Sequence, residues 1–174
     1  MERETINNLV DCSIYHQRGI YDLISLDNIT SASALYRVQY ESHIKATWLY
    51  EKASEKESNQ ALTRDKWPKT GQMIEDIGCW LGNMEIKAYH KERWKEMNTY
   101  VHSGKNLIDM LNLKDEEYIK RHAEIANTLS YFSNRTSSLA LMGIGRIIDS
   151  IDIQKTGYRL FKQYAPPMDI TLPL

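Results

Sequence analysis

The stretch ALYRVQYESHIKATWLY, residues 34–50, decides how this chain folds. It contains neither proline nor glycine, and Thr30 or Ser31 just before it is a suitable residue to cap a helix at its amino-terminal end. Small or apolar residues recur at helical spacing from just before this stretch to its end: Ser33, Leu35, Val38, Ser42, Ala46 and Leu49. The stretch therefore predicts a long helix with these residues on nearly one face.

The same kind of spacing extends through most of the chain. Only four prolines occur, at positions 68, 166, 167 and 173, so the segments between them contain no obligatory helix breaker. No part of the sequence shows several strands separated by hairpin turns. Apolar periodicity predicts further helices over 6–24, 70–81, 86–101, 115–132 and 137–151.

The predicted fold class is therefore all-α. We expect a single-domain bundle of about six helices over residues 1–165, followed by an extended tail over residues 166–174, where three of the four prolines lie. The chain of 174 residues is long enough for one hydrophobic core and short for two domains.

Several details of the connections follow from local residue types. Residues 26–30 are predicted to form a turn, and the polar run 51–59 either extends the preceding helix or forms a loop. A break is expected near Ser133 and Asn134. Small residues at 140, 143 and 145 favour close approach of a neighbouring helix over a phosphate-binding role, because no preceding strand is predicted.

Charge and composition exclude several classes of protein. Twenty-two basic and 23 acidic residues give a formal net charge of -1, so nucleic-acid binding would need a local basic patch. Cys12 and Cys79 are far apart and predict neither a disulfide framework nor a zinc site, but buried small side chains. No metal and no cofactor are expected.

Neither a secretory leader nor a membrane span is indicated. Glu2, Glu4 and Asp11 lie where a leader would be basic and then apolar. The longest weakly polar stretch, residues 137–148, contains Arg146 and is shorter than the roughly 20 residues that span a bilayer. A cytoplasmic protein with no membrane partner is the expectation.

Arg37 and Glu41 form the first candidate site. At about 100° per residue, they and Trp48 fall within about 40° of one another around the helix. One interpretation is an ion pair that orients helices in the core or at a dimer interface. The other is a binding site, in which Arg37 holds a phosphate or carboxylate and Glu41 orients the guanidinium or acts as a base.

The stretch WKEMNTYVHSG, residues 94–104, is the second candidate site. Asn98 and His102 are one helical turn apart, and Gly104 lets the backbone leave the helix. This arrangement is a common way to place an imidazole at the edge of a groove, although a lone histidine is more often structural. Tyr100 beside them is a candidate to contact a ligand.

His43 follows Arg37 by six residues. On a continuous helix this spacing turns the side chain through about 600°, which leaves His43 about 120° away from Arg37. The two side chains can act together only if the helix breaks or a second subunit supplies one of them.

An arginine followed after five residues by a histidine, in an all-helical chain, resembles the HEPN group of bacterial and archaeal proteins. The resemblance implies a metal-independent ribonuclease of a toxin or phage-defence system, which dimerises so that two copies of the motif meet at a cleft. Arg37 and His43 are the literal matches, whereas Val38 stands where the group usually has a polar residue. In such an enzyme the histidine removes the proton from a ribose 2′ hydroxyl and the arginine stabilises the phosphorane.

The candidate catalytic residues are therefore Arg37, His43, Asn98 and His102, and the candidate binding residues are Arg37, Glu41, Trp48 and Tyr100. RNA and a second copy of the chain, as a homodimer, are the expected partners. The alternative is a non-catalytic helical interaction or scaffold module, antitoxin-like or a subunit of a homo-oligomer, whose aromatic faces and tail mediate assembly. A bundle with a ligand pocket between helices is the third possibility.

Overall fold

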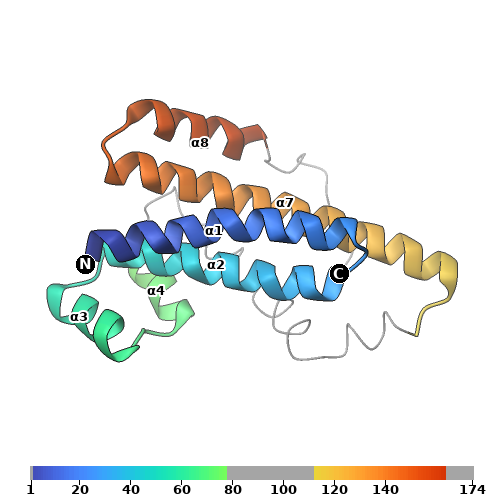
Figure 1. Ribbon diagram of the computed structural model, residues 1–174, viewed down its shortest axis with the longest axis horizontal. Helices are drawn as coiled ribbons and strands as arrows, with labels where there is room; N and C mark the ends of the chain where they lie inside the picture. Colours follow the sequence, from blue (N-terminus) through green and yellow to red (C-terminus); the bar gives the residue numbers. More distant parts are fainter. Residues whose placement is uncertain (1, 78–111, 164–174) are drawn as a thin grey trace.

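The computed structural model describes residues 2–77 and 112–163 (Figure 1). This part of the chain contains six helices and no strand, so the all-α prediction is confirmed. The helices are α1 (Glu2–Ser25), α2 (Ile29–Glu51), α3 (Glu55–Arg64), α4 (Thr70–Ile77), α7 (Asp115–Ile147) and α8 (Ile151–Gln163). None of the described helices is both long and apolar enough to cross a membrane.

Three long helices, α1, α2 and α7, form the body of the molecule (Figure 1). Helices α1 and α2 pack along each other as a hairpin, and α7 packs against both. Helix α8 folds back along α7, while α4 packs against α2. The core lies between the three long helices, and its largest fully buried side chains include Trp48, Tyr36 and Ile20.

Helix α2 is buried around most of its circumference, because α1, α4 and α7 all pack against it. Val38 is 46% exposed, whereas Ser42 and Leu49, predicted to share its face, are buried. The cap is also two or three residues earlier than predicted, since the side chain of Asn28 accepts a hydrogen bond from the Ser31 amide at 3.2 Å.

The polar segment after α2 forms its own short helix, α3, rather than the predicted extension or loop. Ser54 caps this helix, and its amide donates to the Glu57 carboxylate at 2.9 Å in a capping box. Hydrogen bonds from Ser54 hold the pKa of Glu57 below its usual value. The S-x-x-E pattern was present in the sequence and is the signal for this helix.

Helix α7 runs unbroken through Ser133 and Asn134, so the predicted break there is wrong. Both side chains bond to other helices: Ser133 Oγ donates to Gln39 Oε1 at 2.8 Å, and Asn134 Oδ1 accepts from Gln17 Nε2 at 2.6 Å. Near its other end, His122 Nε2 lies 3.1 Å from Asp27 Oδ1 in the α1–α2 turn. The polar residues therefore join α7 to its neighbours.

Helix α8 is the element that the sequence pattern misses. Its apolar residues are few and Gly157 interrupts them, yet a Cβ at Gly157 would lie 2.6 Å from Met142 Cγ, so the glycine is what lets α8 pack closely on α7. The predicted packing role is confirmed for Gly145, where a Cβ would lie 2.7 Å from the backbone of Gln154. It is wrong for Gly143, which faces open space.

One further prediction from composition is also wrong. Cys12 is exposed on α1 rather than buried as a small apolar side chain. Cys79 lies outside the described residues.

Candidate functional site

Arg37 and Glu41 form the ion pair that their spacing predicts. Arg37 Nε donates to Glu41 Oε1 at 2.9 Å, and the two side chains are 23% and 27% exposed. Trp48 lies on the same side of α2 but is buried, and its Nε1 donates to Asp76 Oδ2 at 3.2 Å in α4. Trp48 thus anchors α4, while the ion pair remains partly accessible.

His43 is buried in the interior of the bundle and does not share a face with Arg37. Only 4% of His43 is exposed, and its Nδ1 makes no hydrogen bond. Burial lowers the pKa of His43 to about 4, so the imidazole is neutral at pH 7. The described chain therefore does not present Arg37 and His43 together in a single subunit.

The imidazole of His43 faces a small hollow between α1, α2 and α7. Ile6 and Val10 from α1, and Ala140 and Gly143 from α7, form its apolar walls. The space left free is about 10 Å³, which is room for about one water molecule. The hollow is therefore too small for a substrate.

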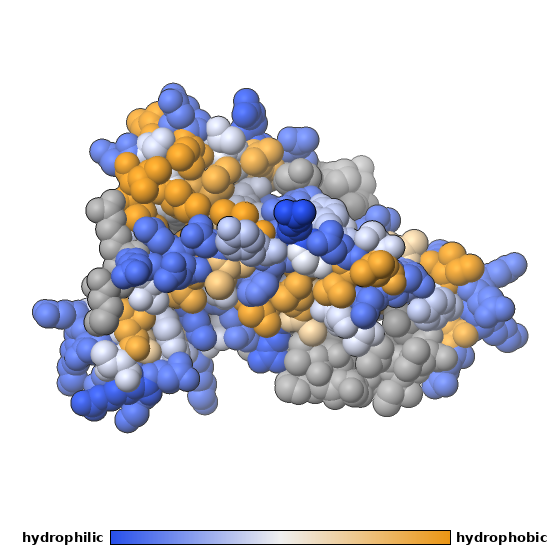
Figure 2. Space-filling view, in the orientation of Figure 1, coloured by the Kyte–Doolittle hydropathy of each residue, from blue (hydrophilic) through white to orange (hydrophobic). Residues whose placement is uncertain are grey.

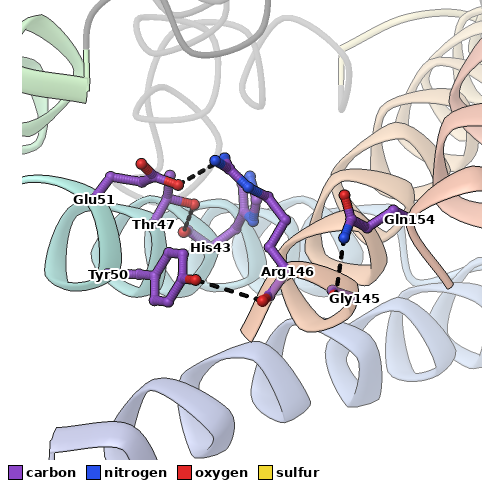
Figure 3. A network of polar contacts seen from close by, with 7 residues as sticks. All are labelled: His43, Thr47, Tyr50, Glu51, Gly145, Arg146 and Gln154. Atoms are coloured by element: carbon purple, nitrogen blue, oxygen red, sulfur yellow. Dashed lines mark hydrogen bonds and ion pairs between the residues drawn. The ribbon is translucent and has the colours of Figure 1, made fainter. Parts of the chain in front are cut away.

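An ion pair between α2 and α7 lies at the edge of this hollow (Figure 3). Arg146 Nη1 lies 2.7 Å from Glu51 Oε1, and the hydroxyl of Tyr50 donates to the carbonyl of Arg146 at 3.5 Å. Thr47 Oγ1 donates to the carbonyl of His43 at 2.9 Å, which fixes the hydroxyl within the helix. No local pattern predicts this pairing, since its partners lie on helices far apart in the chain.

A second set of buried polar groups joins α2 to α7. Gln39 is fully buried, and its Nε2 donates to Ser137 Oγ at 2.8 Å and to the Ser133 carbonyl at 3.2 Å. Its Oε1 accepts from Ser133 Oγ. All the hydrogen-bonding groups of this amide thus have partners, so the network fixes how α2 and α7 pack and carries no free group for chemistry.

A larger groove, with about 160 Å³ of free space, lies between α1 and α8 with α7 as its floor. Ile14, Leu141 and Leu160 supply apolar side chains. The hydrogen-bonded amides of Gln17 and Asn134 supply an uncharged polar part of the lining. The groove therefore favours an apolar partner over a charged one.

Apolar side chains are also exposed just after α7 and along α8. Ile148 is 48% exposed, Ile151 60% and Tyr158 52%. Figure 2 shows apolar surface gathered over α7 and α8 on the face that it draws. We call Ile148, Ile151 and Tyr158 the hairpin patch.

The remaining sequence-predicted site residues are not placed. Asn98, Tyr100 and His102 lie outside the described residues, so their distance from Arg37 and Glu41 stays a prediction. Within residues 2–77 and 112–163, no three His, Cys, Asp or Glu side chains come together in a way that could hold a metal ion.

Comparison with known proteins gives a family for this chain. The model of a family of unknown function, DUF6988, matches residues 10–169. The chain belongs to the DUF6988 family. The match includes Arg37, Glu41, His43 and Arg146, so all these positions lie within the DUF6988 region. No curated protein and no solved structure matches the chain.

Proposed function

We propose that this DUF6988 protein is a helical interaction module that assembles with a second copy of itself. The observation that carries the proposal is the hairpin patch, three large apolar side chains that are each about half exposed just after α7 and along α8. Neighbouring exposed apolar residues on a protein surface are typical of interaction sites, whereas single ones are common anywhere.

The candidate chemical groups support the same proposal. Arg37 is bonded to Glu41, and the imidazole of His43 is buried and neutral. A general base must reach the proton that it abstracts, and His43 has 4% of its surface exposed. These groups suit packing and orientation better than catalysis.

The net charge fits assembly with an identical chain. With 22 basic and 23 acidic residues, two copies have almost no net electrostatic repulsion to overcome. The same balance provides no overall positive field to attract RNA.

Sedimentation velocity on the full chain tests the proposal. We expect a dimer at micromolar concentration, and a shift of Ile151→Glu to monomer with an unchanged circular dichroism spectrum. Ile119→Glu is the matched control, because Ile119 is 66% exposed but lies in the first part of α7, away from the hairpin patch. A wild-type protein that stays monomeric at high concentration would contradict the proposal.

A HEPN-like, metal-independent ribonuclease is the second candidate function. One observation favours it: Glu41 holds the Arg37 guanidinium in a fixed orientation while about a quarter of each side chain remains exposed. That is the arrangement expected of an arginine that binds phosphate.

The test is incubation of RNA with the protein in the presence of a chelator. The nuclease proposal expects cleavage that leaves a cyclic phosphate and is lost in Arg37→Ala and in His102→Ala. Arg18→Ala, at an exposed arginine of α1, should cleave like wild type. Absence of cleavage, or cleavage that survives both changes, would reject these residues as catalytic.

A further inference from the structure

The exposed side chains of α8 lie on one half of the helix, directed away from α7. Helix α8 is at the edge of the molecule (Figure 1), and Gly157, buried against Met142 of α7, marks its inner side. At about 100° per residue, its exposed residues fall within an arc of about 140° centred opposite Gly157. We call this arc the outer face of α8. It consists of Ile151, Asp152, Lys155, Tyr158, Arg159, Lys162 and Gln163.

Two residues of the hairpin patch form the apolar part of the outer face. Ile151 and Tyr158 are seven residues apart, so they lie within about 20° of each other around α8, two turns apart along it. Lys162 Nζ lies 5.6 Å from the centre of the Tyr158 ring, so the apolar and basic parts of the face are continuous. Exposed apolar side chains of this size gain stability when another apolar surface covers them.

The charges of the outer face change sign along the helix. Asp152 lies in the first turn, whereas Arg159 and Lys162 lie in the second half. This order suits the helix dipole, which accounts for the charges but not for the exposure of Ile151 and Tyr158. A second α8 that runs parallel to the first would bring each charge against its own counterpart, whereas an antiparallel one brings acid against base. The outer face is therefore complementary to itself in the antiparallel direction.

A two-fold axis that passes between positions 154 and 155 satisfies the apolar and the charge pattern together. It places Ile151 of each copy opposite Tyr158 of the other. At 1.5 Å per residue, Asp152 of each copy then lies about 3 Å along the helix from Arg159 of the other, on the same flank of the contact. Lys155 lies beside the axis, where its long stem can follow the contact while its amine stays in solvent. The contact is isologous and closes at two chains.

We propose that the outer face of α8 is the dimer interface and packs antiparallel on the outer face of a second copy. Contacts between Ile151 and Tyr158 form the centre of the interface, and ion pairs between Asp152 and Arg159 form its rim. One helix of 13 residues from each copy makes a small contact, which suits a dimer of micromolar affinity. This assignment rests on the proposed function, because it names the surface through which the module assembles.

Charge reversal at the two ends of α8 tests the assignment by sedimentation velocity. Asp152→Arg brings two arginines together at both rims of its own dimer, and Arg159→Asp brings two aspartates together. We therefore expect each variant alone to raise the dissociation constant about tenfold. An equal mixture of the two variants should form a heterodimer about as tight as wild type, because both of its rims pair arginine with aspartate. The chain that carries both changes should dimerise like wild type for the same reason.

Recovery on mixing separates loss of the interface from loss of folding, since a misfolded variant would not recover. Glu55→Arg is the matched control, because Glu55 is an exposed acid in the first turn of α3, on the opposite side of the molecule from α8 (Figure 1). It should dimerise like wild type. Wild-type dimers together with α8 variants that dimerise normally, or that stay weak when mixed, would overturn the α8 pair and leave assembly standing. A wild-type monomer would overturn the proposed function itself, and the α8 pair with it.

Discussion

The α1–α2–α7 body and the α7–α8 hairpin distribute polar and apolar side chains in opposite ways. The body buries hydrogen-bonded polar groups, among them Gln39, Ser133 and Ser137, in the centre of its packing. The hairpin exposes apolar groups, with Ile151 60% and Tyr158 52% accessible. Buried polar groups with all their partners fix one arrangement of helices, whereas exposed apolar groups gain stability by meeting a partner. We infer that the body fixes the shape and the hairpin provides the contact.

Among the changes that test this comparison, Gln39→Ala is expected to have the largest effect on the free energy of unfolding. The change removes three hydrogen bonds in the body, leaves buried serine hydroxyls without their partner and opens a cavity. We expect the free energy of unfolding to fall by about 3 kcal/mol, measured by urea denaturation. Gln163→Ala, at an exposed glutamine of α8, should change it by less than about 0.5 kcal/mol. Equal effects of the two changes would show that the network does not stabilise the body.

The buried imidazole of His43 predicts the second effect, a dependence of the free energy of unfolding on pH. Its pKa is about 4 in the folded chain against 6.5 when exposed, so between these values the unfolded chain binds more protons and acid favours unfolding. The contribution of His43 to stability is fully present above pH 6.5 and is lost as the pH falls towards about 4. We expect a decrease of about 2 kcal/mol between pH 7.5 and pH 5, from urea titrations.

His43→Gln separates this contribution from those of the other histidines. The variant should lose clearly less stability over the same pH range, because its buried side chain does not titrate. Identical pH profiles of variant and wild type would mean that His43 is accessible to protons in the folded state.

Two glycines of the hairpin predict effects on stability with opposite signs. Gly157→Ala places a Cβ 2.6 Å from Met142 Cγ and 2.9 Å from the Ser138 carbonyl, so α8 must move away from α7, at a cost of about 1–3 kcal/mol. Gly143→Ala meets nothing within 4 Å and should stabilise α7 by about 0.5–1 kcal/mol. Thermal unfolding of both variants measures the difference. A stabilising Gly157→Ala would mean that the close α7–α8 contact is not formed.

Prediction from sequence succeeds here where the information is local. Helical spacing predicts the long helices, and the four-residue spacing of Arg37 and Glu41 predicts their ion pair. It fails where a residue's role depends on a distant partner. By residue type alone Ser133 and Asn134 predict a helix break, but in the fold Ser133 donates a hydrogen bond to Gln39 and Asn134 accepts one from Gln17. Gly157 likewise interrupts the apolar pattern of its segment, and its role is clear only from the close contact with Met142. The pairing of Arg146 with Glu51 has no local signal at all.

The unbroken length of helix α7 has a consequence for motion, because the helix connects two distant parts of the molecule. At 1.5 Å per residue its 33 residues span about 50 Å, and the hairpin patch begins just beyond one end while the contact between His122 and Asp27 lies near the other. A rod without a hinge transmits tilt along its full length. Docking at the hairpin that tilts α7 would therefore change the distance between His122 and the turn that joins α1 to α2.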